Sequence, residues 1–208
     1  MNARDWPSLD STLSEHFDQL ALRRTEVGST ETGKRLRLRI ASMGDAAGRL
    51  MARYLLQLQY TRIFEIGTCA GIGAAYMCSA AERNGRVTFH GLEGVEEKRQ
   101  IAQETLDLFC PNTEATIHPG HFDDSFEPAL AAASPLQFVY LDGRHKREPS
   151  IKMFNRCVEE MPDGGVIVCD DLDHQAMGDC RKKFTKHPRT VSTLAFAKKV
   201  AFTIGATK

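Results

Sequence analysis

The chain has 208 residues, and its 27 lysines and arginines balance 27 aspartates and glutamates. This length suits one domain with a full-sized core, and the 42% hydrophobic content argues against a disordered chain or a broadly basic nucleic-acid-binding protein. The start lacks the apolar core of a signal peptide and no later window is apolar over the thickness of a bilayer, so we expect a cytoplasmic protein with no membrane partner. The six cysteines are widely spaced without a C-x-x-C pair, so we expect them to be core thiols.

The first predicted element is a short amphipathic helix, marked by apolar residues at helical spacing: Leu9, Leu13, Phe17 and Leu20. The polar stretch VGSTETG (27–33) is predicted to be a loop, and a second helix follows it and runs to Tyr60. We therefore divide the chain into an N-terminal helix and loop (1–33) and a main domain (34–208).

Short apolar runs then alternate with amphipathic segments. The predicted strands are IFEI, VTFHGLE, ATIHPG, LQFVYLD and GVIVCDD, and the predicted helices that follow them are 73–83, 95–109, 125–133, 148–161 and 174–186. Such alternation is typical of a parallel sheet covered on both faces. RTVSTLAFA and VAFTIGA flank Lys198 and Lys199 with no room for a helix, which predicts a terminal hairpin. The predicted fold is α/β, a Rossmann-like three-layer sandwich with a mostly parallel seven-stranded sheet and a C-terminal antiparallel hairpin.

The stretch IFEIGTCAGIGAAY (63–76) joins the first of these strands to its helix through a glycine-rich turn. Such a turn lets backbone approach a ligand closely. The G-x-x-x-G-x-G spacing of Gly67, Gly71 and Gly73 differs from the G-x-G-x-x-G of dinucleotide-binding proteins, which ranks an NAD-dependent oxidoreductase last. Glu65 suits a ligand with an ammonium group, and Glu93, at the next strand end, can accept hydrogen bonds from both ribose hydroxyls. The pattern indicates a cationic nucleoside ligand.

Four motifs, EIGTCAGIG, the strand end at Glu93, YLDGRH and GGVIVCDDL, resemble those of class I S-adenosylmethionine-dependent methyltransferases over residues 34–208. Within this family the chain looks most like the small metal-dependent O-methyltransferases of the catechol and caffeoyl-CoA type, and like the related sugar and macrolide enzymes with D-G-x-H and D-D. MGDAAGRLM (43–51) also resembles the loop and helix before the first strand of the catechol enzyme. The resemblance implies methyl transfer from S-adenosylmethionine to a hydroxyl of a small phenolic or sugar-like molecule.

The resemblance also implies which residues bind the cofactor. Glu65, Gly67 and Gly71 would hold its methionine end, and Glu93 would hold its ribose. The other implied contacts are Met43 and Gly44 at the sulfonium, Cys69 and Gly73 in the glycine-rich stretch, Gly120, His121, Phe122 and Asp123 around the adenine, and Asp142. The alternatives are a solvated loop position for Glu93 and a core position for Phe122.

Three aspartates close neighbouring strands, Asp142 the fourth strand and Asp170 and Asp171 the fifth. Unpaired carboxylates at one sheet edge would repel one another, whereas a hard octahedral cation accepts such an oxygen cluster. We therefore predict that these residues bind Mg²⁺ or another divalent cation, which would lower the pKa of the substrate hydroxyl. The alternatives are a helix N-cap for Asp170 or Asp171 and a cofactor contact for Asp142 in a metal-free enzyme. Catechol-type enzymes have asparagine at the position of Asp171.

The candidates for the general base follow Asp142 directly. Arg144 suits an anionic substrate group, because arginine stays protonated. By the resemblance, His145 takes the place of the catechol enzyme's catalytic lysine, and histidine is the residue type whose unperturbed pKa, about 6.5, suits a base at neutral pH. Lys146 is the second choice as base. The alternative is a solvated R-H-K-R loop.

The methyl acceptor is less closely defined by the sequence. VSTLAFA has no acid to match the catechol enzyme's glutamate, so a catechol is not assured. The basic run KRLRLRI (34–40) raises transfer RNA with a modified uridine as a second substrate class, which ranks lower because the run has no aromatic residue to stack on a base. A non-catalytic S-adenosylmethionine-binding protein is a further alternative. By resemblance alone, residues 1–33 are expected to serve as a lid, substrate or dimer region, and the chain to form a homodimer.

Overall fold

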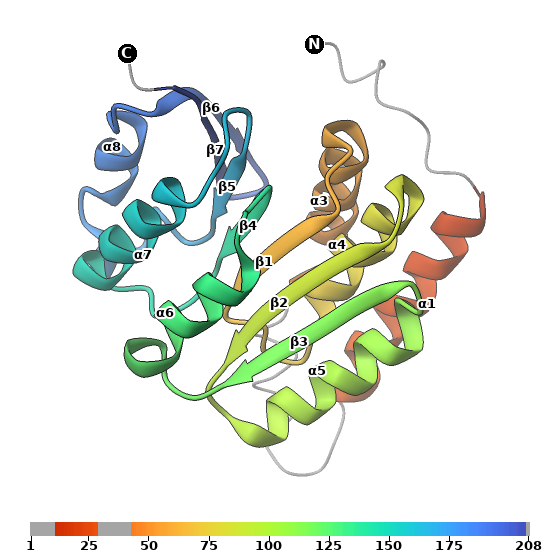
Figure 1. Ribbon diagram of the computed structural model, residues 1–208. Coiled ribbons are helices and arrows are strands. Elements are labelled where there is room, and N and C mark those ends of the chain that lie inside the picture. The colour runs from red at the N-terminus through yellow and green to blue at the C-terminus, as the bar shows by residue number, and fades with distance from the viewer. Residues whose placement is uncertain (1–10, 29–42, 207–208) are drawn as a thin grey trace. The chain divides into compact units, whose positions relative to one another are not determined.

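The computed structural model describes residues 11–28 and 43–206 (Figure 1). Its strands, in chain order, are β1 (Arg62–Ile66), β2 (Val87–Glu93), β3 (Thr113–Pro119), β4 (Phe138–Leu141), β5 (Val166–Cys169), β6 (Thr190–Phe196) and β7 (Lys199–Ile204). They form one seven-stranded sheet with the order β3-β2-β1-β4-β5-β7-β6. β4 is parallel to β1 and β5, whereas β7 is antiparallel to β5 and β6. The predicted Rossmann-like sheet with its C-terminal antiparallel hairpin is therefore confirmed.

Two compact units are interleaved along the chain. Among the described residues, the first comprises 11–28, 43–61, Thr68–Thr88 and Val95–Ile117, and the second comprises Arg62–Gly67, Phe89–Gly94 and 118–206. The predicted boundary between residues 33 and 34 lies outside the described residues. Within 11–28 and 43–206, every helix is too short or too polar to cross a membrane. All six cysteines are free and all but Cys69 are buried, as predicted for core thiols.

A helix buried along its whole length forms the centre of the first unit. α4 (Ile72–Ala81) is apolar on all sides and contacts α1 (Ser11–Gly28), α3 (Asp45–Leu58) and α5 (Glu96–Phe109). The close approach of α3 depends on Gly48, because a Cβ there would lie 2.5 Å from the ring of Tyr76. The Tyr76 hydroxyl donates a hydrogen bond to the carboxylate of Asp45 at 2.6 Å, so a polar contact also ties α4 to α3.

The N-terminal helix is amphipathic, as its apolar spacing predicts. Leu13, Phe17 and Leu20 of α1 are buried, and His16 Nε2 lies 2.8 Å from the Ser79 hydroxyl in α4. The predicted loop at 27–33 is wrong at its start, because α1 continues through Gly28. The rest of that stretch lies outside the described residues.

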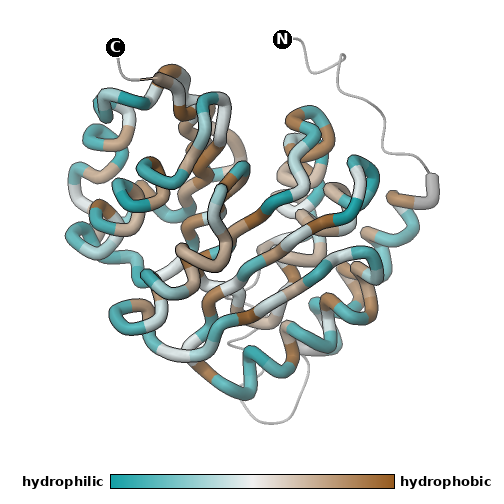
Figure 2. Tube along the Cα trace, viewed as in Figure 1, coloured by the Kyte–Doolittle hydropathy of each residue, from teal (hydrophilic) through white to brown (hydrophobic). Residues whose placement is uncertain are grey.

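Aromatic packing fills much of the second unit. Phe154 of α7 (Arg147–Glu159) stacks on Phe184 of α8 (Cys180–Thr185) with ring centroids 4.0 Å apart, and Phe202 of β7 meets both rings edge-on. β4 and β5 are buried at every position, in keeping with the hydrophobic colouring along these strands (Figure 2). This burial explains why both strands read as apolar runs in the sequence.

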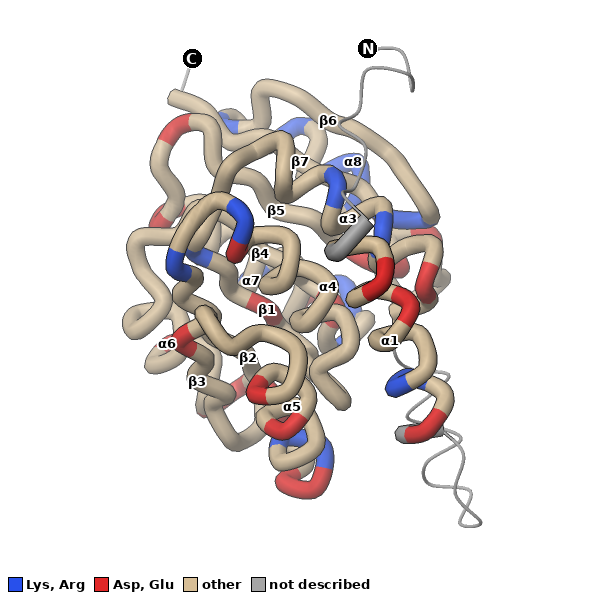
Figure 3. Tube along the Cα trace, turned by 90° about the vertical axis from the view of Figure 1, so that its right-hand side faces the viewer, with Lys and Arg blue, Asp and Glu red and all other residues tan. Residues whose placement is uncertain are grey.

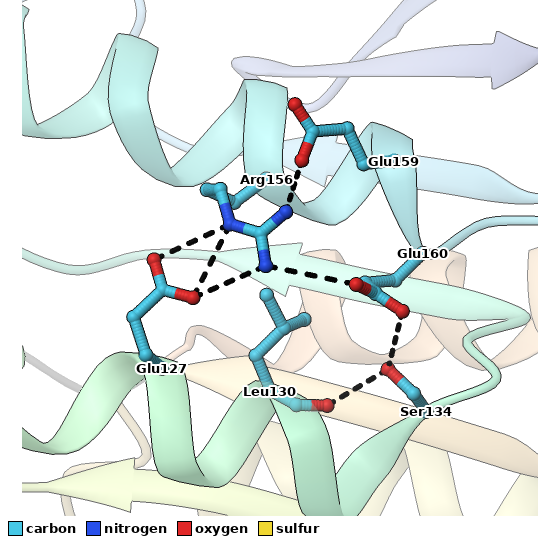
Figure 4. Close-up of polar contacts among 6 residues, drawn as sticks. All are labelled: Glu127, Leu130, Ser134, Arg156, Glu159 and Glu160. Atoms are coloured by element: carbon cyan, nitrogen blue, oxygen red, sulfur yellow. Dashed lines mark hydrogen bonds and ion pairs between the residues drawn. The ribbon is translucent and has the colours of Figure 1, made fainter.

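A surface ion network joins α7 to α6 (Phe122–Ala133). Arg156 lies between Glu127 of α6 and Glu159 and Glu160 at the end of α7, with Nη2 3.2 Å from Glu127 Oε2 and 3.6 Å from Glu160 Oε1 (Figure 4). Because the Arg156 side chain is 33% exposed, water screens these pairs and each contributes little to stability.

Two predicted helices differ from the observed ones. α6 begins at Phe122 rather than at 125, since Asp123 and Asp124 provide the acidic first turn that favours a helix N-terminus. The segment 174–186 is not one helix. Gly178, with φ of 54°, separates a short 3₁₀ turn (Gln175–Met177) from α8. A left-handed residue interrupts the helical hydrogen-bond pattern, so only the second half is α-helical.

Candidate functional site

The ends of β4 and β5 bring acidic residues together in the second unit. The parallel register pairs Leu141 with Cys169, so the next residues, Asp142 and Asp170, lie side by side at the carboxyl edge of the sheet. The Asp170 amide donates a hydrogen bond to the Leu141 carbonyl at 3.0 Å, which fixes this arrangement. The strand positions in the sequence predicted this juxtaposition.

A buried lysine, which the sequence reasoning missed, contacts Asp170. Lys199 Nζ lies 2.6 Å from Asp170 Oδ2, and their side chains are 7% and 15% exposed. The Tyr140 hydroxyl donates a hydrogen bond to the same oxygen at 2.7 Å, while the Asp171 amide donates to Oδ1 at 2.9 Å. Both carboxylate oxygens of Asp170 are therefore already engaged by donors of the protein itself.

The buried charges shift the ionisation of their neighbours. Burial, and then the negative charges of Asp170 and Asp171, raise the pKa of the Asp142 carboxyl well above its ordinary value, against the opposing influence of Lys199. Burial likewise raises the pKa of Tyr140, and the carboxylates of Asp142 and Asp170 raise it further. Tyr140 is therefore a neutral hydrogen-bond donor in this cluster.

His145 lies between two of the aspartates. Its Nε2 atom is 3.9 Å from Asp142 Oδ1 and its Nδ1 atom is 3.7 Å from Asp171 Oδ2. The His145 side chain is 40% exposed and so is accessible to a substrate. Arg144 instead forms an ion pair with Asp123, and Lys146 is the exposed residue that precedes α7. Of the three candidates, His145 is the one whose ring lies within 4 Å of Asp142 and Asp171.

The predicted magnesium site is not supported by this arrangement. Among residues 11–28 and 43–206, no three or more His, Cys, Asp or Glu side chains are grouped so as to hold a metal ion. The physical reason lies at Asp170, whose oxygens accept from Lys199, Tyr140 and the Asp171 amide. A cation would have to displace an ammonium group that already neutralises this carboxylate. The ligand set Asp142, Asp170 and Asp171 therefore does not fit a metal.

Protein packing accounts for two of the glycines in the glycine-rich turn. Gly67 has a φ of 99°, and a Cβ there would clash with the Asp142 carbonyl. Gly71, with φ of 77°, begins α4, and a Cβ there would lie 2.8 Å from the Ala102 backbone in α5. Cys69 is also left-handed, whereas Gly73 is buried in the first turn of α4. Gly67 and Gly71 are thus required by the fold whether or not a ligand approaches them.

Thr68, in the same turn, is a residue that the sequence reasoning missed. It is 3% exposed, and within the described part of the chain its hydroxyl has no hydrogen-bond partner. A buried hydroxyl without a partner is costly, so it indicates a place where a polar ligand atom would be accepted. The signal in the sequence was a small polar residue between two glycines of a ligand-binding turn.

The two predicted cofactor-binding glutamates are buried. Glu65 on β1 is 2% exposed and Glu93 at the end of β2 is 8% exposed. Burial excludes the solvated-loop alternative for Glu93. Because glutamate is rarely buried without a specific role, both positions remain candidates for binding a polar ligand.

The predicted adenine-binding segment folds around the start of α6. Gly120 has a φ of 106°, exposed His121 is the N-cap residue, and Asp123 in the first turn pairs with Arg144, which lowers the pKa of Asp123. Phe122 packs on the core of the second unit, with its Cζ 2.7 Å from where a Cβ on Gly143 would lie. Phe122 is therefore at least in part the core aromatic of the alternative interpretation. Met43, buried, and Gly44 precede α3 in the first unit.

Comparisons with known proteins agree with the fold. Residues 64–172 match a family described as "Methyltransferase domain". No curated protein matches the chain. Similar solved structures include an O-methyltransferase from Bacillus cereus in complex with S-adenosylhomocysteine, which is 14% identical with a TM-score of 0.68 over 96% of this chain and 99% of that one.

Two further solved structures are similar over nearly the whole chain. TomG, an O-methyltransferase of tomaymycin synthesis from Streptomyces achromogenes solved with S-adenosylmethionine, is 20% identical with a TM-score of 0.65, covering 99% of this chain and 100% of that one. The S-adenosylhomocysteine-bound methyltransferase PaMTH1 from Podospora anserina is 14% identical with a TM-score of 0.70, covering 98% and 92%. At these identities the likeness shows a shared fold.

Proposed function

Because the chain belongs to the family of methyltransferase domains, we propose that it transfers the methyl group of S-adenosylmethionine to a hydroxyl of a small phenolic or sugar-like molecule. The observation that carries this proposal is the accessible His145 between Asp142 and Asp171 at the carboxyl edge of the sheet. In open α/β sheets this edge is where ligands bind.

The residues around the glycine-rich turn fit the cofactor. Glu93 would accept hydrogen bonds from the ribose, and Thr68 offers a buried hydroxyl that lacks a hydrogen-bond partner among the described residues. Glu65 would face the ammonium group of the methionine end. When bound, S-adenosylmethionine supplies an electrophilic methyl group together with its own leaving group.

His145 would accept the proton of the substrate hydroxyl. Asp171 Oδ2, 3.7 Å from Nδ1, would stabilise the positive charge that the imidazole gains. Asp142 Oδ1 lies 3.9 Å from Nε2, the other ring nitrogen. The proposed roles are a general base at His145 and electrostatic support at Asp171.

An RNA substrate has less support. The run KRLRLRI lies outside the described residues, and elsewhere acidic residues are interspersed with basic ones, as along α1 and α5 (Figure 3). Phosphate binding favours a face of one sign, which this interspersion does not provide. Small-molecule transfer therefore ranks ahead of the transfer-RNA alternative.

The proposal is tested with labelled S-adenosylmethionine and a panel of phenols, sugars, hydroxylated metabolites and bulk transfer RNA. We expect a methylated small-molecule hydroxyl, identified by mass spectrometry. Label found in RNA that declines with salt would favour the RNA alternative, and cofactor binding without any product would favour a non-catalytic protein.

Two single substitutions test the base. His145→Ala should lower kcat by about 10²–10⁴-fold, because general-base catalysis contributes on that order, while cofactor affinity measured by calorimetry changes little. Lys146→Ala is the matched comparison at the next residue and should retain most activity. A large loss in Lys146→Ala with an active His145→Ala would transfer the role of base to Lys146.

A further inference from the structure

The hairpin at the end of the chain places a lysine opposite the acidic cluster. The antiparallel register pairs Cys169 of β5 with Val200 of β7, so Asp170 and Lys199 follow on directly opposite each other. Lys199 is the first residue of β7 and is 6% exposed, whereas Lys198 beside it in the turn is exposed. Of these two adjacent lysines, the structure directs only one toward the carboxylates.

Lys199 contacts the cluster as a fixed cation. Its ammonium lies 2.6 Å from Asp170 Oδ2 and 5.8 Å from the centre of the Tyr140 ring. Charge-assisted hydrogen bonds of this length are strong, and burial removes the competing water. The local positive charge that three neighbouring carboxylates require is therefore supplied, in part, by the chain itself.

A divalent ion bound to Asp170 would compete directly with this ammonium. Charges of the same sign a few ångströms apart repel strongly even at an effective dielectric constant of about 20, and a displaced Lys199 would be left buried without its partner. Asp170 Oδ1 already accepts one hydrogen bond, from the Asp171 amide.

We propose that the Lys199 ammonium takes the place that a divalent cation would occupy beside Asp170, and that methyl transfer by this protein is independent of metal. Metal-independent methyl transfer rests on the proposed function, whereas the place of the Lys199 ammonium beside Asp170 does not. Lys199 acts through Asp170 and is a positioning residue. Without a bound cation to acidify the acceptor, phenols, which ionise near pH 10, are favoured over less acidic sugar hydroxyls.

The first test measures binding of Mn²⁺ alone by electron paramagnetic resonance, and so needs no substrate. Wild-type protein and Lys198→Ala, the exposed neighbour, should show no site at about 1 mM Mn²⁺. Lys199→Ala and Lys199→Met, each checked for folding by circular dichroism, should bind Mn²⁺ at least about tenfold more tightly than the wild type, because removal of the like charge frees a carboxylate oxygen. Lys199→Arg should behave as the wild type.

Two results would overturn the proposal. One is that the wild type binds Mn²⁺ and Asp170→Asn does not, because the metal would then bind Asp170 either together with Lys199 or in its place. This measurement remains decisive if the Lys199 variants do not fold. The other is an equal Mn²⁺ affinity in the wild type and the folded Lys199 variants.

The second test adds excess chelator to the methyl-transfer assay with an accepted hydroxyl substrate. We expect unchanged kcat in the wild type, and chelator-sensitive activity would overturn metal independence. If no hydroxyl substrate is found at all, the proposed function fails while the Mn²⁺ measurements still decide the place of Lys199.

Discussion

Replacing Lys199 by methionine should destabilise the protein strongly. The methionine side chain preserves much of the apolar stem but leaves Asp170 buried without the ammonium 2.6 Å away. Breaking a buried ion pair by removing one partner costs about 3–5 kcal/mol. Asp170 keeps its hydrogen bonds from Tyr140 and the Asp171 amide, so we expect the lower end, about 3 kcal/mol. Lys198→Met at the exposed neighbouring position should change stability by less than about 0.5 kcal/mol.

A double-mutant cycle isolates the pair from other effects of the substitutions. The double variant Lys199→Met/Asp170→Asn should lose less stability than the two single variants lose in sum, by about 1.5–3 kcal/mol. Each single substitution leaves one buried charge without its partner, whereas the double variant has neither charge. The free energies come from urea unfolding followed by circular dichroism, with the slope m checked for constancy. A coupling below about 0.5 kcal/mol, or a Lys199→Met variant as stable as the wild type, would show that the ammonium is solvated and would refute the reasoning.

Three further predictions concern the turn, the cluster and the cofactor. Gly67→Ala combines a left-handed φ with a clash against backbone, so it should lower the free energy of unfolding by roughly 3 kcal/mol. Gly85 also has a positive φ but open space around a new Cβ, so Gly85→Ala should cost the backbone strain alone. Equal losses of stability in urea unfolding would exclude the clash. The raised pKa of Asp142 means that the folded protein holds this proton to higher pH than the unfolded chain, which releases it above about pH 4. Stability therefore falls as pH rises from about 4, and Asp142→Asn should melt above the wild type by a margin that grows with pH in this range; parallel melting curves would contradict this. Glu93→Gln should weaken S-adenosylmethionine binding in calorimetry by about tenfold while Glu114→Gln, an exposed control, should not.

Most of the fold could be predicted because its signals are local. Buried parallel strands such as β4 and β5 read as apolar runs of four residues, and the terminal hairpin had no room for a helix. The errors also have local physical causes. Gly178, with its positive φ, divides a segment whose apolar spacing is helical throughout. Glycine adopts either sign of φ readily, so its presence alone did not predict the break.

The sequence predicted only those parts of the candidate site in which strand order alone determines where the residues lie. Asp142 and Asp170 follow paired strand ends, so their proximity needs nothing beyond a parallel sheet. Thr68 was missed because packing around the turn, which the sequence does not show, buries its hydroxyl without a hydrogen-bond partner among the described residues. Lys199 was missed because its burial beside a turn depends on the register between β5 and β7. Two short apolar runs in the sequence do not determine that register.

The position of Lys199 changes what the acidic motif means. Clustered carboxylates need compensating positive charge, and a metal ion, a bound proton and a lysine ammonium all supply it. Here Lys199 supplies positive charge beside Asp170, and burial with the neighbouring negative charges raises the pKa of Asp142. A metal would make the acceptor hydroxyl acidic by itself, whereas the metal-independent reaction proposed above needs a base, for which we propose His145. The carboxylate cluster alone therefore does not distinguish the two mechanisms, and the Lys199 substitutions test them.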